Sequence, residues 1–343
     1  MEKIKIGIPR AFFYYIYYPA WRTYFEFLGC EVITSPPTTR EIIDFGVKDA
    51  VAEACVPVKI FFGHVHKLKD KVDYLFIPRV ISMNGKTIYC PKFLGLPDMI
   101  RSAIPNLSKL IDVTIDSRKD PFALQKAAIK VAKDLGYSAW DGLKALHKAF
   151  KIHKRYLALL NKGVFPDKAI PFLFLDKADD TELLKSASTF TNKIVATQSS
   201  LKLAILGYPY TVYDSFINVN LFDKLREMGV EVVTMEMIAP KTLEKQRKKT
   251  VKRLFWTFSE MVSRTAYHFF ENDEAIDGIL HVTAFGCGPD FMVDKLMEIE
   301  AKKRHNRVPF MSLSIDEHTG EAGIMTRIEA FCEMVRRRKE AAV

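Results

Sequence analysis

The sequence has no apolar run approaching the ~20 residues that a membrane-spanning helix needs. Its N-terminus, M-E-K-I-K-I, lacks the regions of a signal peptide. It also contains no Gly-rich phosphate-binding fingerprint, no zinc-finger spacing and no RNA-binding sheet signature. We therefore expect a soluble cytoplasmic protein that does not itself hydrolyse ATP and whose partners are neither membranes nor nucleic acids.

Cysteine is scarce, and its five occurrences are scattered among 343 residues. An odd number at such spacings does not make a disulfide framework, so these residues are core fillers, catalysts or metal ligands. The chain is long enough for two average-sized domains with substantial cores.

The formal net charge is +10. Much of it comes from Lys- and Arg-rich stretches at 241–253 and 336–339. Such runs are usually solvated helix faces, and we favour that interpretation over a nucleic-acid patch. Binding of an anionic small molecule such as a CoA ester, or of an acidic protein partner, is the alternative that this charge leaves open.

Short apolar runs alternate with helical periodicity in the first third of the chain, which is typical of an α/β fold with a parallel sheet. Thr38 follows a Pro-Pro break and is predicted to cap a helix. The predicted strands cover residues 4–9, 31–35, 73–78 and 111–116, and the predicted helices include 19–28 and 58–69.

The middle of the chain is Lys- and Ala-rich, and residues 121–136 and 138–162 are predicted to be helices. Residues 169–175 are apolar and ambiguous between a strand and a buried turn. Strand-like alternation returns at 203–209.

An internal match relates the two ends of the chain. Shifted by 200 positions, Gly7 and Pro9 fall on Gly207 and Pro209. The same shift and a rough length-adjusted match relate residues 29–34 to 229–234, 115–116 to 315–316, and 73–78 to 277–282. We interpret this as two Rossmann-like open parallel-sheet lobes, the product of a duplication. The predicted domains are a first lobe at 1–118, a helical linker at 119–200 and a second lobe at 201–343.

The internal match and the local sequence divide the cysteines into core residues and candidate ligands. Cys30 aligns with Val230, and Cys332 lies among apolar residues at helical spacing, so both are predicted to be core residues. Cys55, Cys90 and Cys287 instead sit beside proline in E-A-C-V-P-V-K, C-P-K and F-G-C-G-P-D.

These three cysteines are predicted to hold an iron–sulfur cluster in a cleft between the lobes. Loops at the carboxyl ends of parallel strands converge. Proline and glycine constrain such loops and leave amides for cluster sulfurs. Three thiolates on a four-iron cluster leave one iron without a protein ligand. A zinc site with a fourth ligand is the alternative.

Ordered segments over nearly the whole chain carry a family resemblance. They are I-G-I-P-R-A-F-F-Y-Y at 6–15, L-G-C-E-V-I-T-S-P at 28–36, E-A-C-V-P-V-K at 53–59, G-H-V at 63–65, F-I-P-R at 76–79, C-P-K-F-L-G-L-P-D at 90–98, F-G-C-G-P-D at 285–290 and D-E-H-T-G-E-A-G-I-M-T-R at 316–327. With these segments the chain resembles the acyl-CoA dehydratase activase-related proteins, which are related to the cluster-binding subunits of 2-hydroxyacyl-CoA dehydratases and benzoyl-CoA reductases.

The resemblance implies an oxygen-sensitive [4Fe-4S] protein of anaerobes with Rossmann-like lobes. It also implies a separate ATP-dependent activator that carries its own iron–sulfur cluster and donates low-potential electrons. A double-cubane cluster needs more ligands than Cys55, Cys90 and Cys287 supply, unless a homodimer shares it, so a single cubane is favoured.

Other residues are expected around the cluster. His318 or Glu321 is the candidate proton donor, although Glu321 also suits a helix cap. His64 is expected to be a packed histidine. The candidates for cofactor binding or charge balance are Lys59, Arg79, Lys92, Gly286 and Gly288, with Arg10 nearby.

Three functions stay open. The first is an electron-transferring protein that reduces or dehydrates a small molecule or CoA thioester, in the manner of an (R)-2-hydroxyacyl-CoA dehydratase. The second is a non-enzymatic carrier or assembly protein for clusters or electrons. The third is a two-lobed small-molecule binding protein in which the cysteines are incidental.

Overall fold

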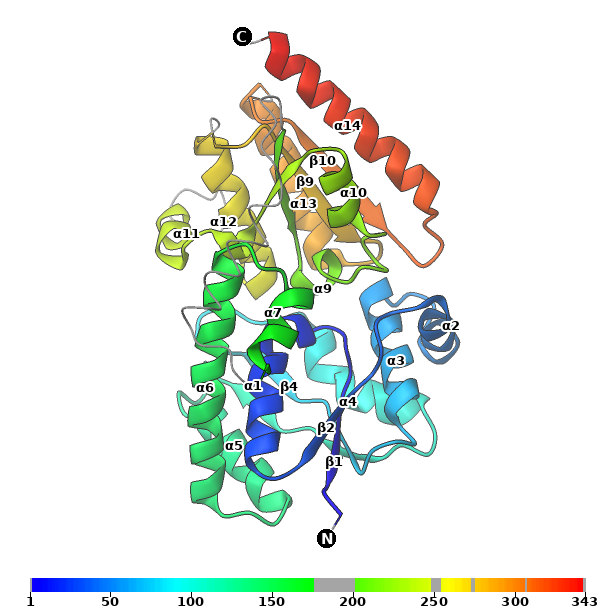
Figure 1. The fold of residues 1–343 in the computed structure, drawn as a ribbon, viewed down its shortest axis with the longest axis vertical. Helices are drawn as coiled ribbons and strands as arrows, with labels where there is room; N and C mark the ends of the chain where they lie inside the picture. Colours follow the sequence, from blue (N-terminus) through cyan, green and yellow to red (C-terminus); the bar gives the residue numbers. More distant parts are fainter. Residues whose placement is uncertain (1, 176–200, 248–253, 273–274, 306, 342–343) are drawn as a thin grey trace. The chain divides into compact units, whose positions relative to one another are not determined.

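The computed structural model describes residues 2–175, 201–247, 254–272, 275–305 and 307–341 (Figure 1). The chain forms two compact units, each with its own sheet. Unit 1 comprises Met1–Leu157 with Phe255–Thr257, and unit 2 comprises Ala158–Leu254 with Phe258–Val343. Among the described residues, no helix is both long and apolar enough to cross a bilayer.

Unit 1 is built on a four-stranded parallel sheet in the order β2-β1-β3-β5. Its strands are β1 (Lys5–Ile8), β2 (Glu31–Thr34), β3 (Tyr74–Phe76) and β5 (Lys109–Ile111). The alternation of apolar strands with helices therefore predicted the fold class and the positions of β1, β2 and β3 correctly, whereas the predicted strand at 111–116 overlaps β5 only at Ile111.

A second pair of strands continues this sheet. β4 (Arg79–Ser82) and β6 (Thr114–Asp116) pair in parallel as a two-stranded sheet. Between the two sheets, the Ile77 N–H donates to the Ile111 carbonyl and the Arg79 N–H donates to the Val113 carbonyl. The predicted strand at 111–116 is thus divided between β5 and β6.

Helix α2 of unit 1 starts at a side-chain cap, and α3 and α4 start with a proline in the first turn. The Thr39 side chain accepts a hydrogen bond from the Ile42 N–H and caps α2, so the predicted cap at Thr38 is wrong by one residue. Thr38 instead bonds the buried His64 side chain at 3.0 Å. The helices are α1 (Tyr14–Phe27), α2 (Arg40–Asp49), α3 (Val56–Leu68), α4 (Pro91–Ala103), α5 (Ala123–Asp134) and α6 (Ala139–Asn161), the last of which runs into unit 2.

Helices α2 and α3 touch through their backbones at two glycines. A Cβ atom built on Gly46 would lie 1.7 Å from the Lys59 carbonyl oxygen, and one on Gly63 would lie 1.8 Å from the Ile42 carbonyl oxygen. No side chain larger than hydrogen fits at either position. The contact fixes α3, and therefore the residue that precedes it, Cys55.

Unit 2 has a four-stranded parallel sheet in the order β10-β9-β7-β8. Its strands are β7 (Lys202–Gly207), β8 (Glu231–Thr234), β9 (Gly278–Ala284) and β10 (Phe310–Ile315). Its helical segments are α7 (Pro166–Leu173), α9 (Pro209–Val212), α10 (Leu221–Glu227), η1 (Met235–Met237), α11 (Pro240–Gln246), α12 (Thr257–Glu271), α13 (Gly288–Lys303) and α14 (Glu321–Ala341).

The prediction of a strand or buried turn at residues 169–175 is wrong, because most of this stretch lies in α7. Pro166 occupies the first turn, where proline is favoured. Ala169, Ile170 and Leu173 are buried at helical spacing. In the sequence, this helical spacing of buried residues is hidden, because the residues beside them are apolar too.

The two units share one topology, which supports the duplication. In both, the first strand lies between the second and the third, and the fourth lies beyond the third. In unit 1 the Asp73 carboxylate accepts from the Lys5 N–H at 2.7 Å, and in unit 2 Asp277 accepts from the Lys202 N–H at 2.7 Å. Each of these lysines is paired in register with a glutamate, Glu31 or Glu231.

The register corrects one part of the internal match. Because Lys5 corresponds to Lys202, Gly7 corresponds to Ala204 and not to Gly207. The match of residues 29–34 with 229–234 agrees with the register of β2 and β8. Residues 115 and 315 lie in unlike places, since Ile115 belongs to the two-stranded sheet and Ile315 to the main one.

Candidate functional site

Cys55, Cys90 and Cys287 share one local structure. Each is the residue immediately before a helix, at α3, α4 and α13 respectively, and each helix has a proline in its first turn. A residue at this position lies beside the first backbone N–H groups of the helix, which have no partner within the helix, and beside the positive end of the helix dipole. Both features stabilise a thiolate.

Cys55 and Cys90 belong to unit 1, and both are partly exposed. Burial raises the pKa of each thiol, while the Val58 N–H at Cys55 and the Lys92 N–H at Cys90 oppose the rise by hydrogen bonding. The neighbouring Cys90 raises the pKa of Cys55 further, and the Lys92 ammonium lowers both. The two thiols are thus close enough to interact electrostatically and share one cation.

Burial outweighs the opposing effects, so both thiols are protonated at neutral pH. A metal bound by them would displace these protons, and the helix amides and Lys92 would then offset the negative charge of the thiolates. Among the described residues, no group of three or more His, Cys, Asp or Glu side chains is arranged to hold a metal ion. Cys287 belongs to unit 2, and its convergence with the other two stays a prediction.

Two of the predicted basic neighbours have different settings. Lys92 is half-buried in the first turn of α4, beside Cys90. Lys59 is only 5% exposed on α3, one turn beyond Cys55. Both therefore lie on the helices that the two cysteines precede.

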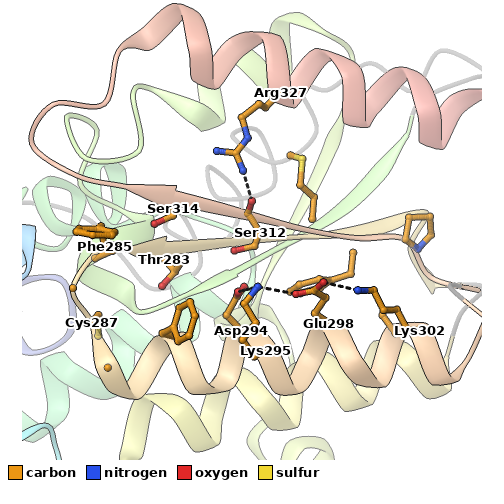
Figure 2. Close-up of a pocket in the computed structure, with 18 of the residues that line it drawn as sticks. Thr283, Phe285, Cys287, Asp294, Lys295, Glu298, Lys302, Ser312, Ser314 and Arg327 are labelled. Atoms are coloured by element: carbon orange, nitrogen blue, oxygen red, sulfur yellow. Dashed lines mark hydrogen bonds and ion pairs between the residues drawn. The ribbon is translucent and has the colours of Figure 1, made fainter.

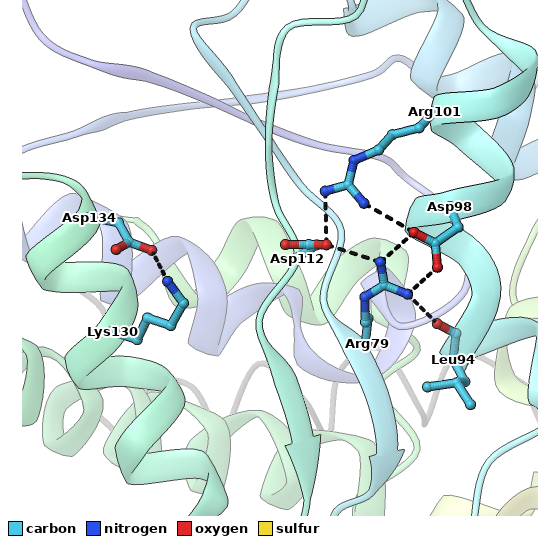
Figure 3. A network of polar contacts seen from close by, with 7 residues as sticks. All are labelled: Arg79, Leu94, Asp98, Arg101, Asp112, Lys130 and Asp134. Atoms are coloured by element: carbon cyan, nitrogen blue, oxygen red, sulfur yellow. Dashed lines mark hydrogen bonds and ion pairs between the residues drawn. The ribbon is translucent and has the colours of Figure 1, made fainter.

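Arg79 is held in an ion-pair network (Figure 3). Its guanidinium donates to Asp98 at 2.5 and 2.6 Å, to Asp112 at 3.1 Å and to the Leu94 carbonyl at 3.1 Å. Arg101 joins the same two carboxylates. Because Leu94 and Asp98 lie on α4, the network ties that helix to β4 and helps to position Cys90, and the charge of Arg79 is balanced locally.

In unit 2, Cys287 follows β9 in a tight turn. Gly286 has φ of 78°, in the left-handed region that glycine tolerates. A Cβ on Gly288 would meet no atom within 4 Å, which leaves open space at the start of α13. Cys287 itself is 9% exposed.

Cys287 lies at one end of a pocket of about 840 Å³ within unit 2. Figure 2 shows its walls, with α13 on one side, α14 on the other and β10 between them. Thr283 also lines the pocket; it is 4% exposed, and its hydroxyl has no hydrogen-bond partner among the residues that the structure describes.

Beside this pocket lies a buried network that the sequence did not reveal. His281 is fully buried, and its Nδ1 lies 2.9 Å from Asp294 and its Nε2 3.2 Å from Asp290. Burial alone would lower the pKa of His281, but the charges and hydrogen bonds of the two carboxylates outweigh it and raise that pKa to about 9. A histidine in the apolar run G-I-L-H-V-T-A, followed by two aspartates four residues apart on one helix face, was the available signal.

The proposed proton donors lie elsewhere in unit 2. The His318 side chain is 78% exposed in the turn before α14. Glu321 is the first residue of α14 and forms an ion pair with Lys224. Neither residue lines the pocket.

A comparison with protein families assigns most of the chain. Residues 5–238 match the model of the family described as CoA enzyme activase uncharacterised domain (DUF2229). The matched range contains Cys55 and Cys90, whereas Cys287, β9 and β10 lie beyond it. No curated protein matches the chain. Because the match covers more than half of its length, the chain belongs to the family of the CoA enzyme activase uncharacterised domain.

Proposed function

We propose that the chain is an iron–sulfur protein in which Cys55 and Cys90 of unit 1 and Cys287 of unit 2 bind a [4Fe-4S] cluster. Its role is low-potential electron transfer to a small molecule or CoA thioester that is reduced or dehydrated. The observation that carries this proposal is the shared setting of the three thiols, each at the N-terminus of a helix with a proline in its first turn.

The residues around the thiols have defined tasks in this proposal. The cluster, when bound, supplies one-electron transfer at a low potential. The N–H groups of Val58 and Lys92 donate hydrogen bonds to the ligating sulfurs, and the Lys92 ammonium offsets their charge. The backbone contact of Gly46 with α3 and the Arg79 network keep the two helix starts in place.

The family bears on the kind of partner that we propose. A CoA enzyme activase domain supports a place in a CoA enzyme system. We propose that a separate ATP-dependent activator with its own cluster donates the electrons. His318 and Glu321 stay the candidate proton donors.

The test is anaerobic reconstitution with iron and sulfide, followed by metal analysis and electron paramagnetic resonance. The wild type should hold about four irons per chain and be brown. Cys55→Ser or Cys90→Ser should each remove most of the iron, and Cys287→Ser should lower the content or change the spectrum. The matched control is Cys332→Ala, which alters a buried core cysteine and should leave the iron unchanged. A colourless wild type, or full iron in Cys55→Ser and Cys90→Ser, would sink the proposal.

A non-enzymatic electron or cluster carrier is the second candidate. It is favoured by the positions of His318 and Glu321, of which one is exposed and the other ion-paired, both outside the pocket lining. Adding acyl-CoA thioesters to the reduced protein distinguishes the two candidates. A paramagnetic spectrum that no thioester changes indicates the carrier.

A further inference from the structure

A groove runs along the free edge of the unit 2 sheet. β10 is the last strand in the order β10-β9-β7-β8, and no described strand pairs with its other side. The pocket of about 840 Å³ follows this edge (Figure 2). Its wall on α13 extends from Gly288 to Lys302, which corresponds to about 21 Å at ~1.5 Å per helical residue. An extended peptide of about six residues spans that length.

The edge presents to the groove main-chain groups that do not pair with β9. The N–H of Ile279 donates to the Pro309 carbonyl and that of Phe285 to the Ile315 carbonyl. In a parallel pair, alternate residues bond one neighbour, so the N–H and C=O groups of Phe310, Ser312 and Ser314 point away from β9. The Ser312 carbonyl agrees with this, because it accepts from the Arg327 guanidinium at 2.7 Å (Figure 2).

The accessible charge of the groove is positive. The cations that line it are Lys295, Lys302, Arg327 and Arg338. The two acidic lining residues are already engaged: Asp294 is buried against His281, and Glu298 is bonded by Lys295 and Lys302. These two lysines are therefore paired, and the cations that an incoming carboxylate would meet are Arg327 and Arg338 on α14.

Exposed apolar side chains accompany these charges. Phe291 on α13 is 59% exposed and Met334 on α14 is 44% exposed, and both line the groove. Large exposed apolar side chains around an unpaired strand edge are a liability unless a partner covers them.

We propose that this groove binds an extended, acidic segment of a partner protein by strand addition to β10. The main chain of the segment pairs with the outward groups of Phe310, Ser312 and Ser314. Its carboxylates bind Arg327 and Arg338 on the α14 side, and its alternate side chains, which point to the opposite face, pack on Phe291 of α13.

Arg327 gives this binding a defined first step. In the free protein it covers the Ser312 carbonyl and so protects the edge. An incoming carboxylate offers the guanidinium a stronger, charge-assisted partner and releases that carbonyl to the strand. A neutral or basic segment offers no such exchange. The proposal does not depend on a metal group, and its test uses the protein without one.

The experiment measures binding of a fluorescein-labelled peptide of about seven residues, alternating glutamate and valine, by fluorescence anisotropy. The wild type should bind it, and a peptide with lysine in place of each glutamate should not bind. A peptide with proline at the central valine should bind at least about tenfold more weakly, since it loses a main-chain donor.

The charge variant is Arg327→Glu with Arg338→Glu, which should weaken binding by about tenfold or more. Its matched control is Arg336→Glu with Arg337→Glu, which makes the same charge change on α14 outside the groove lining and should stay within about twofold. Equal binding of the acidic and basic peptides, or equal effects of the two double variants, overturns the proposal. So does a concentration-dependent dimer in sedimentation that only the groove variant abolishes, because a second copy would then occupy the edge.

Discussion

His281 is a buried base that two carboxylates keep charged. Without Asp290 and Asp294, burial would favour the neutral ring, but with them the pKa rises from 6.5 to about 9. Stabilisation of this kind is complete below the unfolded pKa of 6.5, and it is lost as the pH rises through the folded value. Its size is about 3 to 4 kcal/mol, because each unit of pKa shift corresponds to about 1.4 kcal/mol.

The stability of unit 2 should therefore fall between pH 6.5 and about 9. Asp290→Asn removes one of the two charges and should reduce the slope of the unfolding free energy against pH in this range. Urea unfolding at several pH values, followed by a probe in unit 2, measures it. His281→Gln should abolish the slope, and equal slopes in the wild type and Asp290→Asn would contradict the assignment.

The structural setting of a residue was predictable where its neighbours in the sequence determine that setting. The prolines beside Cys55, Cys90 and Cys287 indicate helix starts or turns, and all three cysteines lie at helix starts. The network of His281 was not predictable in the same way, since its partners come from another element and only the packing of α13 on β9 brings them together.

At the scale of elements, the contact of α2 with α3 determines where Cys55 lies. Gly46 and Gly63 let the two backbones meet, and a methyl group at either position would overlap a carbonyl oxygen. Neither a cap nor a turn requires glycine there, so helix periodicity alone gives no sign of the contact. The shift of the α2 cap from Thr38 to Thr39 has a related cause, because Thr38 is drawn inward by its bond to His64.

Gly46→Ala should destabilise unit 1 by about 3 kcal/mol or more, since the backbones must separate. Gly95→Ala is the matched control on α4, where a Cβ meets nothing within 4 Å, and it should stabilise by about 0.5 to 1 kcal/mol. Chemical unfolding of both variants measures the difference. If the chain binds the proposed cluster, Gly46→Ala should also lower its iron content, because α3 positions Cys55. If Gly46→Ala leaves the unfolding free energy unchanged or raises it, as Gly95→Ala should, the close backbone contact of α2 with α3 is contradicted.

The whole molecule repeats one topology in two units that differ in their edges and their buried charges. The alternation of strands and helices predicted both sheets, and the match of residues 29–34 with 229–234 predicted the repeat. The offset at the first strand was not predictable, because Gly7 and Gly207 agree in residue type but not in register. The register is set by the hydrogen bonds between neighbouring strands and by the equivalent aspartates Asp73 and Asp277, which bind the first residue of β1 and β7. A comparison of residue types alone does not include these contacts.

The buried histidines make the two units respond to pH in opposite directions. In unit 1, burial lowers the pKa of His64 to about 3 and that of His153 to about 4. Below pH 6.5 these two histidines bind protons in the unfolded chain but stay neutral in the folded unit. Unit 1 therefore loses stability as the pH falls from 6.5. His281 of unit 2 keeps its full contribution in that range. Burial also lowers the pKa of His268 in unit 2, so this residue acts as the unit 1 histidines do, but it is only half-buried.

Lowering the pH from 8.5 to 5.5 should thus weaken unit 1 while it strengthens unit 2. Hydrogen exchange read by mass spectrometry, corrected for the intrinsic rate at each pH, tests this with peptides from β1 and α1 against peptides from β7 and β9. Protection should fall in the first set and rise in the second. His64→Asn removes one titrating group and should reduce the acid effect in unit 1 alone. A parallel change of protection in both sets would show that other groups control the pH response.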